Sequence, residues 1–531
     1  MSKQGFIKGS IILISSVIIA KAIGAVFKIP VTNMLGGEGM SFFSGAYGLF
    51  LPVYAVTANG LTTAAAKLTA EYSAVNDTQG LLRVHRTALV IFSLLGGVGS
   101  ILLVMFARPF ADKVVMSPDS YLALIAIAPC VLLGCVTAVY RGCREGQSNM
   151  YPTAISQVIE AVVRLAAGLG LCSFVLKYPE KVLPYLPSGT SVTAAAAAAA
   201  VLGITLSMTA GTAFLYITGT GCDKLPDVSL KKVKADKKTA REIMKIFIPV
   251  ALGAAAANLT SLIDLGTLIR GIKKGAETAP QYFFDTFGLD STVNIPEFIY
   301  GSFTGLAVTI FNLVPSITNM FGKSILPHIS GCCACGELSR VKHLTEKMLW
   351  VTSFIAVPCG AGLTVLSKEV LLLLFGSRPT ECAVSAQSLS ILGIAVVFTC
   401  LTASVFSCYQ AAGRADVPVK LMLIGAAVKL MGNLLLIPIP QLNVSGAAIS
   451  TLACYFVIFV LSVLLYPKTL GVRISLSGLL PVGFSGVLCG GAAWVVYPLL
   501  PFSRVISIGL AAVVGGGVYF TAVYLSSNGK P

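Results

Sequence analysis

Residues 443–467 read NVSGAAISTLACYFVIFVLSVLLYP, a run of 25 residues without one charged side chain. A helix needs about 20 apolar residues to cross the hydrocarbon core of a bilayer, since each residue advances it by about 1.5 Å. Apolar stretches of similar length recur along the whole chain. The sequence therefore predicts an all-α integral membrane protein.

The same window predicts about fourteen membrane-spanning helices. They cover residues 8–33, 42–66, 87–109, 120–140, 152–176, 190–219, 246–269, 297–326, 346–367, 384–411, 418–438, 443–467, 476–500 and 503–526. The short apolar run at 370–375 is predicted to lie in the membrane interface. The first apolar stretch is longer than the roughly 7–15-residue core of a signal peptide, so we expect it to be retained as a helix.

Composition excludes an ordinary soluble protein. Of 531 residues 56% are hydrophobic and only 11% are charged, whereas soluble domains carry about 25% charged residues. The net charge of +16 does not indicate nucleic-acid binding, because the basic residues lie mostly between the spans. Most of the 14 cysteines lie inside apolar segments, where cysteine acts as a small hydrophobic side chain, so no disulfide framework is predicted.

The distribution of Lys and Arg predicts the orientation. With the N-terminus placed in the cytoplasm, 23 of the 38 basic residues fall in cytoplasmic segments and 10 on the opposite side. Cytoplasmic loops carry the excess of Lys and Arg in membrane proteins. Both termini are therefore predicted to be cytoplasmic.

Two segments indicate an internal repeat. Residues 146–164 (GQSNMYPTAISQVIEAVVR) and 413–429 (GRADVPVKLMLIGAAVK) each begin with Gly and continue through a Pro into a helix that carries a deep cation, Arg164 or Lys429. Six predicted spans separate them, and an even number makes a parallel repeat. We predict an N-lobe (1–221), a basic linker (222–245), a C-lobe (246–467) and a C-terminal helix pair (468–531).

Five basic residues fall within spans, namely Lys21, Lys28, Arg164, Lys323 and Lys429. Each costs about 2.5–3.5 kcal/mol at the bilayer centre, so we expect them to line a wet cavity or to find partners. Lys21 and Lys28 are two helical turns apart and share a helix face, which favours a shared anion. The alternative is snorkelling towards the headgroups, which is the preferred interpretation for Lys323.

Other polar residues accompany these cations. Gln157, Glu160 and Arg164 form a stripe on the fifth span, where Glu160 and Arg164 are spaced to pair; such a pair could also serve only to order helix packing. Asp264 is the second acidic residue deep within a predicted span, and it could pair with a lysine or bind a coupling cation. Asn433 lies one turn from Lys429. Five positive groups against two negative ones predict an anionic substrate.

Enzymatic and metal-binding motifs are weak. His328, Cys332, Cys333, Cys335 and His343 lack the paired spacing of a structural zinc site. The sequence has no phosphate-binding loop of the ATPase type and no readable nucleophile–base set. We therefore predict a protein that is not an enzyme and needs no metal or other cofactor.

Five segments carry a family resemblance. They are KGSIILISSVIIAKAIGAVFKIPVTNMLGGEGMSFFSGAYGLF (8–50), YRGCREGQSNMYPTAISQVIEAVVR (140–164), NLTSLIDLGTLIRGI (258–272), IYGSFTGLAVTIFNLVPSITNMFGKSILPHIS (299–330) and KLMGNLLLIPIPQLNVSGAAIS (429–450). In this order they resemble the stage V sporulation protein B and lipid II flippase branch of the multidrug/oligosaccharidyl-lipid/polysaccharide exporter superfamily.

This resemblance implies two six-helix lobes of the MATE type plus two C-terminal helices, in a bacterial cytoplasmic membrane. It implies flipping of an undecaprenyl-diphosphate-linked oligosaccharide or peptidoglycan precursor to the outer leaflet. The family's cationic first-span positions match Lys21 and Lys28, and an acidic position of its seventh span matches Asp264. The substrate-binding set is then Lys21, Lys28, Glu160, Arg164, Asp264, Lys429 and Asn433.

Three other functions stay open at this point. A cation-coupled multidrug exporter of the same superfamily should tolerate loss of Lys21 or Lys28. A membrane polymerase or glycosyltransferase needs a large outer loop, and residues 270–296 offer little room for one. A scaffold for cell-wall enzymes would not need the cavity cations. Partners in the flippase interpretation are membrane lipids, the anionic lipid-linked glycan, a coupling ion and cell-wall synthesis enzymes.

Overall fold

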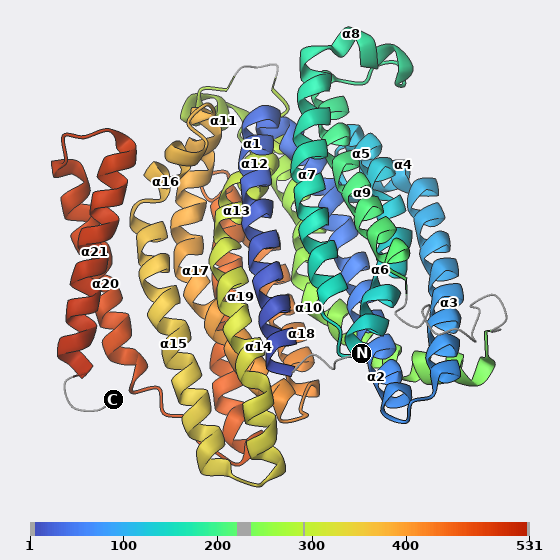
Figure 1. Cartoon of the computed structure of the whole chain (residues 1–531). Helices are drawn as coiled ribbons and strands as arrows, with labels where there is room; N and C mark the ends of the chain where they lie inside the picture. Colours follow the sequence, from blue (N-terminus) through green and yellow to red (C-terminus); the bar gives the residue numbers. More distant parts are fainter. Residues whose placement is uncertain (1–5, 220–234, 290–292, 528–531) are drawn as a thin grey trace. The chain divides into compact units, whose positions relative to one another are not determined.

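The computed structural model describes residues 6–219, 235–289 and 293–527, and this part of the chain contains helices and their connections but no strand (Figure 1). The all-α class predicted from the sequence is confirmed. The chain divides into two compact units. One comprises Met1–Leu35 and Gly39–Leu265, and the other Gly36–Glu38 and Gly266–Pro531. The predicted lobe boundaries stay a prediction.

Twelve helices of the described chain are long and apolar enough to cross a membrane, or thirteen with the bent pair Lys237–Ala256 and Asn258–Thr278. The first of them, Ser15–Ala74, is 60 residues long. It contains most of the predicted spans 8–33 and 42–66, which are therefore counted as one. The number of fourteen spans stays a prediction, whereas the polytopic helical architecture is confirmed.

The first unit is built from long helices joined by short connections. They are α1 (Phe6–Tyr54, except residues 36–38), α2 (Gly60–Ala74), α3 (Thr78–Met105), α4 (Ala107–Phe110), α5 (Tyr121–Ile127), α6 (Pro129–Gly146), α7 (Tyr151–Lys177), α8 (Pro179–Val182), α9 (Val192–Ile217) and the first part of α10 (Lys237–Thr278). Residues 222–234 of the predicted linker lie outside the described residues, and its last part is already helical because α10 begins at Lys237.

The second unit contains the rest of α10 and the remaining helices. These are α11 (Pro280–Phe287), α12 (Ile295–Ser302), α13 (Val308–Phe311), α14 (Leu313–Ala334), α15 (Leu338–Val365), α16 (Ser367–Leu374), α17 (Pro379–Ala411), α18 (Asp416–Leu436), α19 (Asn443–Leu470), α20 (Leu479–Val496) and α21 (Arg504–Ser527). The apolar run at 370–375, expected in the interface, lies mostly in α16, which is too short to span a bilayer.

A glycine pair breaks the long helix α1. Gly36 has a φ of 65°, a conformation that glycine adopts without steric penalty. A Cβ atom there would lie 2.9 Å from Nη1 of Arg378. The backbone N–H of Gly37 donates to Oε1 of Glu381 at 3.3 Å, which satisfies a donor that the helix break leaves without its usual carbonyl. All these contacts lie within the second unit.

The helices expose apolar side chains, and many of their hydroxyl groups form hydrogen bonds within the protein, as expected in a bilayer. On α3, Leu94 and Met105 are 66% and 67% exposed. Thr352 and Ser404 bond each other at 2.8 Å between α15 and α17. Because lipid is as apolar as leucine, packing and hydrogen bonds must hold such helices together.

Helices α7 and α9 approach each other most closely at two glycines. A Cβ atom on Gly203 would lie 2.3 Å from Cα of Gly168, and one on Gly168 would lie 2.5 Å from the Phe27 ring. Small residues at a helix crossing allow backbones to touch, which is a common way to pair membrane helices. This contact positions the polar stripe of α7 against α9.

We expect Gly203→Ala to lower the free energy of unfolding by about 1–3 kcal/mol, because its methyl group overlaps the backbone of α7. Gly170→Ala is the matched control, since nothing lies within 4 Å of a Cβ atom there. Thermal unfolding of both variants in the same detergent measures the difference. Equal melting temperatures would show that α7 and α9 do not meet through this glycine pair.

Candidate functional site

The hairpin formed by α6 and α7 aligns Arg141 with Ser156. Helix α6 ends at Gly146, and α7 begins at Tyr151 with Pro152 in its first turn. Positions 141 and 156 are equally distant from the centre of this turn, so they face each other when the helices run antiparallel. Nε of Arg141 donates to Oγ of Ser156 at 3.1 Å, which is a normal hydrogen-bond length.

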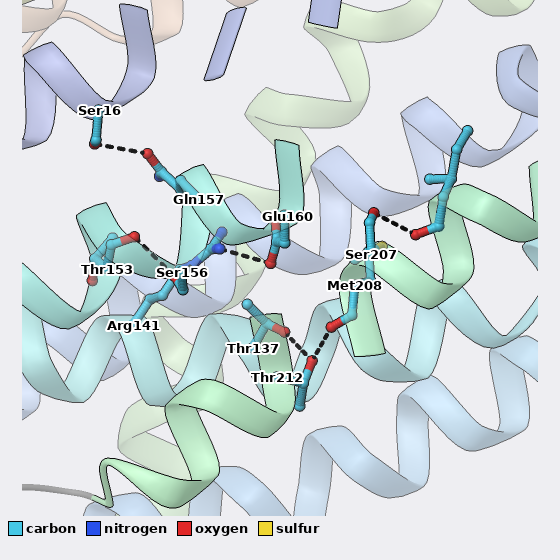
Figure 2. Close-up of polar contacts among 11 residues, drawn as sticks. Ser16, Thr137, Arg141, Thr153, Ser156, Gln157, Glu160, Ser207, Met208 and Thr212 are labelled. Carbon is cyan, nitrogen blue, oxygen red and sulfur yellow. Dashed lines mark hydrogen bonds and ion pairs between the residues drawn. The ribbon is translucent and has the colours of Figure 1, made fainter. Parts of the chain in front are cut away.

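Arg141 also forms a buried ion pair with Glu160, one helical turn beyond Ser156 (Figure 2). Its Nη2 atom lies 2.8 Å from Oε1 of Glu160, and both side chains are 10% exposed. An isolated charge at such a place would be costly, and a charge-assisted hydrogen bond offsets that cost. Figure 2 shows Ser156 beside this pair, with its hydroxyl bonded to the carbonyl of Thr153.

Helix α9 closes the third side of the ion pair with a glycine. A Cβ atom on Gly211 would lie 2.4 Å from Oε1 of Glu160. The next residue, Thr212, bonds the hydroxyl of Thr137 on α6 at 2.6 Å and the carbonyl of Met208 at 2.7 Å (Figure 2). The carboxylate therefore sits in a notch that only glycine leaves open, beside a bond that ties α9 to α6.

The predicted pairing of Glu160 with Arg164 is wrong, because the carboxylate bonds Arg141 instead. Arg141 lies just beyond the predicted span 120–140, whereas the structure places it inside α6 with only 9% of the residue exposed. A hydropathy window assigns a charged residue near the end of a span to the adjacent loop. It contains no information on partners of that residue in other helices. The signal that could have found Arg141 is the hairpin symmetry that places it opposite Ser156.

The other end of the polar stripe on α7 contacts the first helix. Oγ of Ser16 on α1 lies 3.2 Å from Oε1 of Gln157 (Figure 2). On the same helix Lys21 is exposed and Lys28 is half-buried. The structure thus places Lys21, Lys28, Gln157, Glu160 and Arg164 in one unit, and it joins α1 to the stripe through Ser16.

Arg164 and Asp264 are further predicted residues of the first unit, and both are half-buried. Tyr54 lies within electrostatic reach of Arg141, Glu160 and Arg164, so Arg164 belongs to the surroundings of the ion pair although it does not form it. Lys323 lies among residues whose side chains the structure does not describe.

Lys429 and Asn433 belong to the second unit, on α18. They are 4% and 1% exposed. Nδ2 of Asn433 donates to Oγ1 of Thr267 at 2.9 Å and so joins α18 to α10. Because Lys and Asn side chains are rarely buried in apolar surroundings without a role, these two remain candidates for binding an anion.

The cysteine and histidine cluster forms no metal centre in the part of the chain that the structure describes, since no three His, Cys, Asp or Glu side chains converge there. The interior polar groups of the first unit are instead a buried ion pair, amides, hydroxyls and cations. Such a set can bind and orient an anion by electrostatic attraction and hydrogen bonds.

Comparisons with known proteins agree over the whole chain. The model of the family described as polysaccharide biosynthesis protein matches residues 6–332, and that of lipid II flippase MurJ matches residues 294–498. Stage V sporulation protein B of Bacillus subtilis is 24% identical over 99% of this chain and 95% of its own length. Lipid II flippase MurJ of the same organism is 21% identical over 98% and 95%.

Solved structures show the same fold. A lipid II flippase MurJ in an inward closed conformation covers 98% of this chain and 99% of its own, with a TM-score of 0.66 and 13% identity. An inward-facing MATE family multidrug resistance transporter covers 87% and 99%, with a TM-score of 0.66 and 12% identity. The predicted resemblance to this superfamily and its MATE-type fold is confirmed.

We expect Glu160→Gln to lower the free energy of unfolding by about 3–5 kcal/mol, because it leaves the guanidinium of Arg141 buried without its counter-charge. Glu71→Gln makes the same change at an exposed position of α2 and should have little effect. Thermal unfolding of both variants and of the double variant Arg141→Met/Glu160→Leu measures the coupling. If the double variant loses as much free energy of unfolding as the two single variants together, the result would argue against an interaction between Arg141 and Glu160.

Proposed function

Because the chain belongs to the polysaccharide biosynthesis protein family, we propose that it is a flippase for an anionic, lipid-linked saccharide. The substrate class that we infer is a prenyl-diphosphate-linked oligosaccharide or peptidoglycan precursor, carried across the cytoplasmic membrane by alternating access. The full-length likeness to stage V sporulation protein B and to lipid II flippase MurJ supports this proposal.

One observation carries the choice of an anion. Lys21 is exposed and Lys28 and Arg164 are half-buried on membrane helices of the first unit. Cations within membrane-spanning helices usually face the interior of the bundle or a water-filled cavity, where they pair with polar groups or mark the path of a charged substrate. Since Glu160 is already neutralised by Arg141, the three other cations exceed the remaining acid of the set, Asp264.

In the proposed mechanism these cations bind the diphosphate, whose oxygens accept charge-assisted hydrogen bonds. The ion pair of Arg141 and Glu160 holds α6 and α7 in register behind them. The prenyl tail stays in the lipid, because taking it through a polar passage would lose about 0.8 kcal/mol for each buried CH₂. Lys429 and Asn433 are the proposed contribution of the second unit.

The membrane potential can supply a driving force for this cargo. Each negative charge that leaves an inside-negative cell gains roughly 2.3 kcal/mol per 100 mV. Outward movement of a diphosphate is therefore favoured without a coupling ion. A multidrug exporter for cationic drugs would experience the opposite force and would need acids in its cavity, so we prefer the flippase.

The test is complementation of a cell depleted of its lipid II flippase. We expect rescue by the parent and at least tenfold poorer plating with Lys21→Ala, Lys28→Ala or Arg164→Ala, because each removes one of the cations proposed to hold the diphosphate. Lys67→Ala, an exposed basic residue of α2, is the matched control and should rescue like the parent. Expression of all variants is matched by immunoblot.

Two results would change the proposal. A well-expressed parent that does not rescue would redirect the substrate to another lipid-linked glycan, which transport of labelled prenyl-diphosphate sugars in proteoliposomes can identify. Rescue by every cation variant would rule out the proposed binding of the diphosphate by these side chains, whatever the substrate.

We also propose that both termini are cytoplasmic, as the Lys and Arg distribution indicates. Tyr185, between α8 and α9, is 90% exposed and lies in a predicted outer loop. A cysteine introduced by Tyr185→Cys should react with a membrane-impermeant maleimide in intact cells. The exposed Cys335, between α14 and α15, should react only after lysis. Labelling of the parent protein before lysis would reverse the orientation.

A further inference from the structure

A groove of the first unit is formed by side chains of α3, α6 and α9. Its volume is about 410 Å³, which lies within the range of roughly 300–1,000 Å³ for small-molecule sites. The side chains that form its walls are mostly apolar and include Leu89, Leu133, Val136, Tyr140, Ala213 and Tyr216.

The two threonine hydroxyl groups in the groove already form hydrogen bonds within α9. Thr209 donates to the carbonyl of Thr205 at 2.9 Å, and Thr212 donates to that of Met208 at 2.7 Å. An occupant therefore finds mostly hydrocarbon contacts along the walls, and the other hydroxyl groups of the lining are the phenols of Tyr140 and Tyr216. A single acyl or prenyl chain has the matching chemistry, because it needs only dispersion contacts and exclusion of water.

Cations stand at one end of the groove. On α6 the row of Leu133, Val136 and Tyr140 continues one turn later with Arg144, and on α3 Arg86 precedes Leu89 by one turn. Both rows end where α3 begins and α6 finishes, which is the side predicted to be cytoplasmic. An apolar channel with arginines at its membrane-interface end is complementary to a lipid with an anionic headgroup.

The arginine at the end of α6 is held in place. Nη2 of Arg144 donates to the carbonyl oxygens of Thr218 and Gly219, just after the end of α9. Above it the ring of Tyr140 lies between those of His85, at 4.8 Å between centroids, and Tyr216, at 6.5 Å. Aromatic rings of this kind mark the boundary between hydrocarbon and headgroups.

We propose that this groove binds an anionic phospholipid, with one acyl chain between α3, α6 and α9 and its phosphate beside Arg86. The site is distinct from the proposed translocation residues. Arg141 follows Tyr140 by one position, so it points about 100° away around α6 and into the ion pair. The lipid is thus a resident ligand of the first unit and not the cargo.

A phosphodiester suits this end of the groove better than a diphosphate. Arg144 is only 6% exposed and donates to two carbonyl groups, so the half-buried Arg86 is the cation that a headgroup would meet. A site with one such cation is suited to one negative charge rather than two or more. This argument selects a membrane phospholipid over the prenyl-diphosphate cargo proposed above.

The experiment counts bound lipids by native mass spectrometry after exchange into micelles with either phosphatidylglycerol or phosphatidylcholine. We expect the parent to retain phosphatidylglycerol at least fivefold better than phosphatidylcholine. Arg86→Gln should abolish this preference, and Ala213→Trp, which fills the groove, should remove both lipids. Ala213→Leu should give an intermediate loss and guards against misfolding of the larger variant.

Arg83→Gln is the matched control on the same helix. Arg83 lies off the groove row, near Asp236. Hydrogen bonds from the backbone N–H groups of Thr239 and Lys238 keep the pKa of Asp236 below its ordinary value, so the acid stays charged beside Arg83. This variant should bind phosphatidylglycerol like the parent, since Arg83 does not lie on the row that leads to the groove.

Three results would overturn the proposal. Equal retention of phosphatidylglycerol by the parent and Arg86→Gln would contradict the placement of the headgroup. Equal retention by the parent and a folded Ala213→Trp variant would show that the lipid does not bind in the groove. Displacement of phosphatidylglycerol by equimolar undecaprenyl diphosphate would show that the groove holds the tail of the cargo instead. None of these outcomes depends on translocation, so the proposed flippase activity stands or falls separately.

Discussion

A buried charge in a bilayer protein must have a partner, and the pair of Arg141 and Glu160 meets this condition within the first unit. This pair requires that α6 and α7 are aligned, that α9 leaves space for the carboxylate, and that α9 is bonded to α6. The alignment comes from the short turn between α6 and α7, the space from Gly211 on α9, and the bond to α6 from the hydroxyls of Thr137 and Thr212. Three helices are thus arranged around one ion pair.

In both units, glycines and hydroxyl groups form contacts between helices. Where a soluble protein would rely on apolar burial, these helices meet through glycines and hydroxyls. A Cβ atom on Gly425 would overlap Ile458, and one on Gly432 would overlap the side chain of Ser450, so α18 lies close against α19. Thr345 and Tyr466 bond each other at 2.9 Å between α15 and α19.

Helix α6 illustrates how one element serves two purposes. One face carries Arg141 into the ion pair, and the adjacent face carries Leu133, Val136 and Tyr140 along the groove. The two rows differ by one residue in sequence and by about 100° around the helix. Charge on the first face aligns the helices that hold the proposed cargo-binding residues, whereas the second face lines the groove that we propose for a membrane lipid.

The sequence by itself determined the membrane class, the all-helical architecture and the superfamily, because long uncharged runs and local motifs are contained in short windows of the chain. It also identified Glu160 as a special residue, since an acid within a span stands out in any window. The tertiary structure decided the partners. Glu160 bonds Arg141 and not Arg164, and Asn433 bonds Thr267, which is 166 positions away. Such pairs depend on which helices become neighbours and on their rotation about their axes, and no local pattern of hydropathy or spacing contains that information.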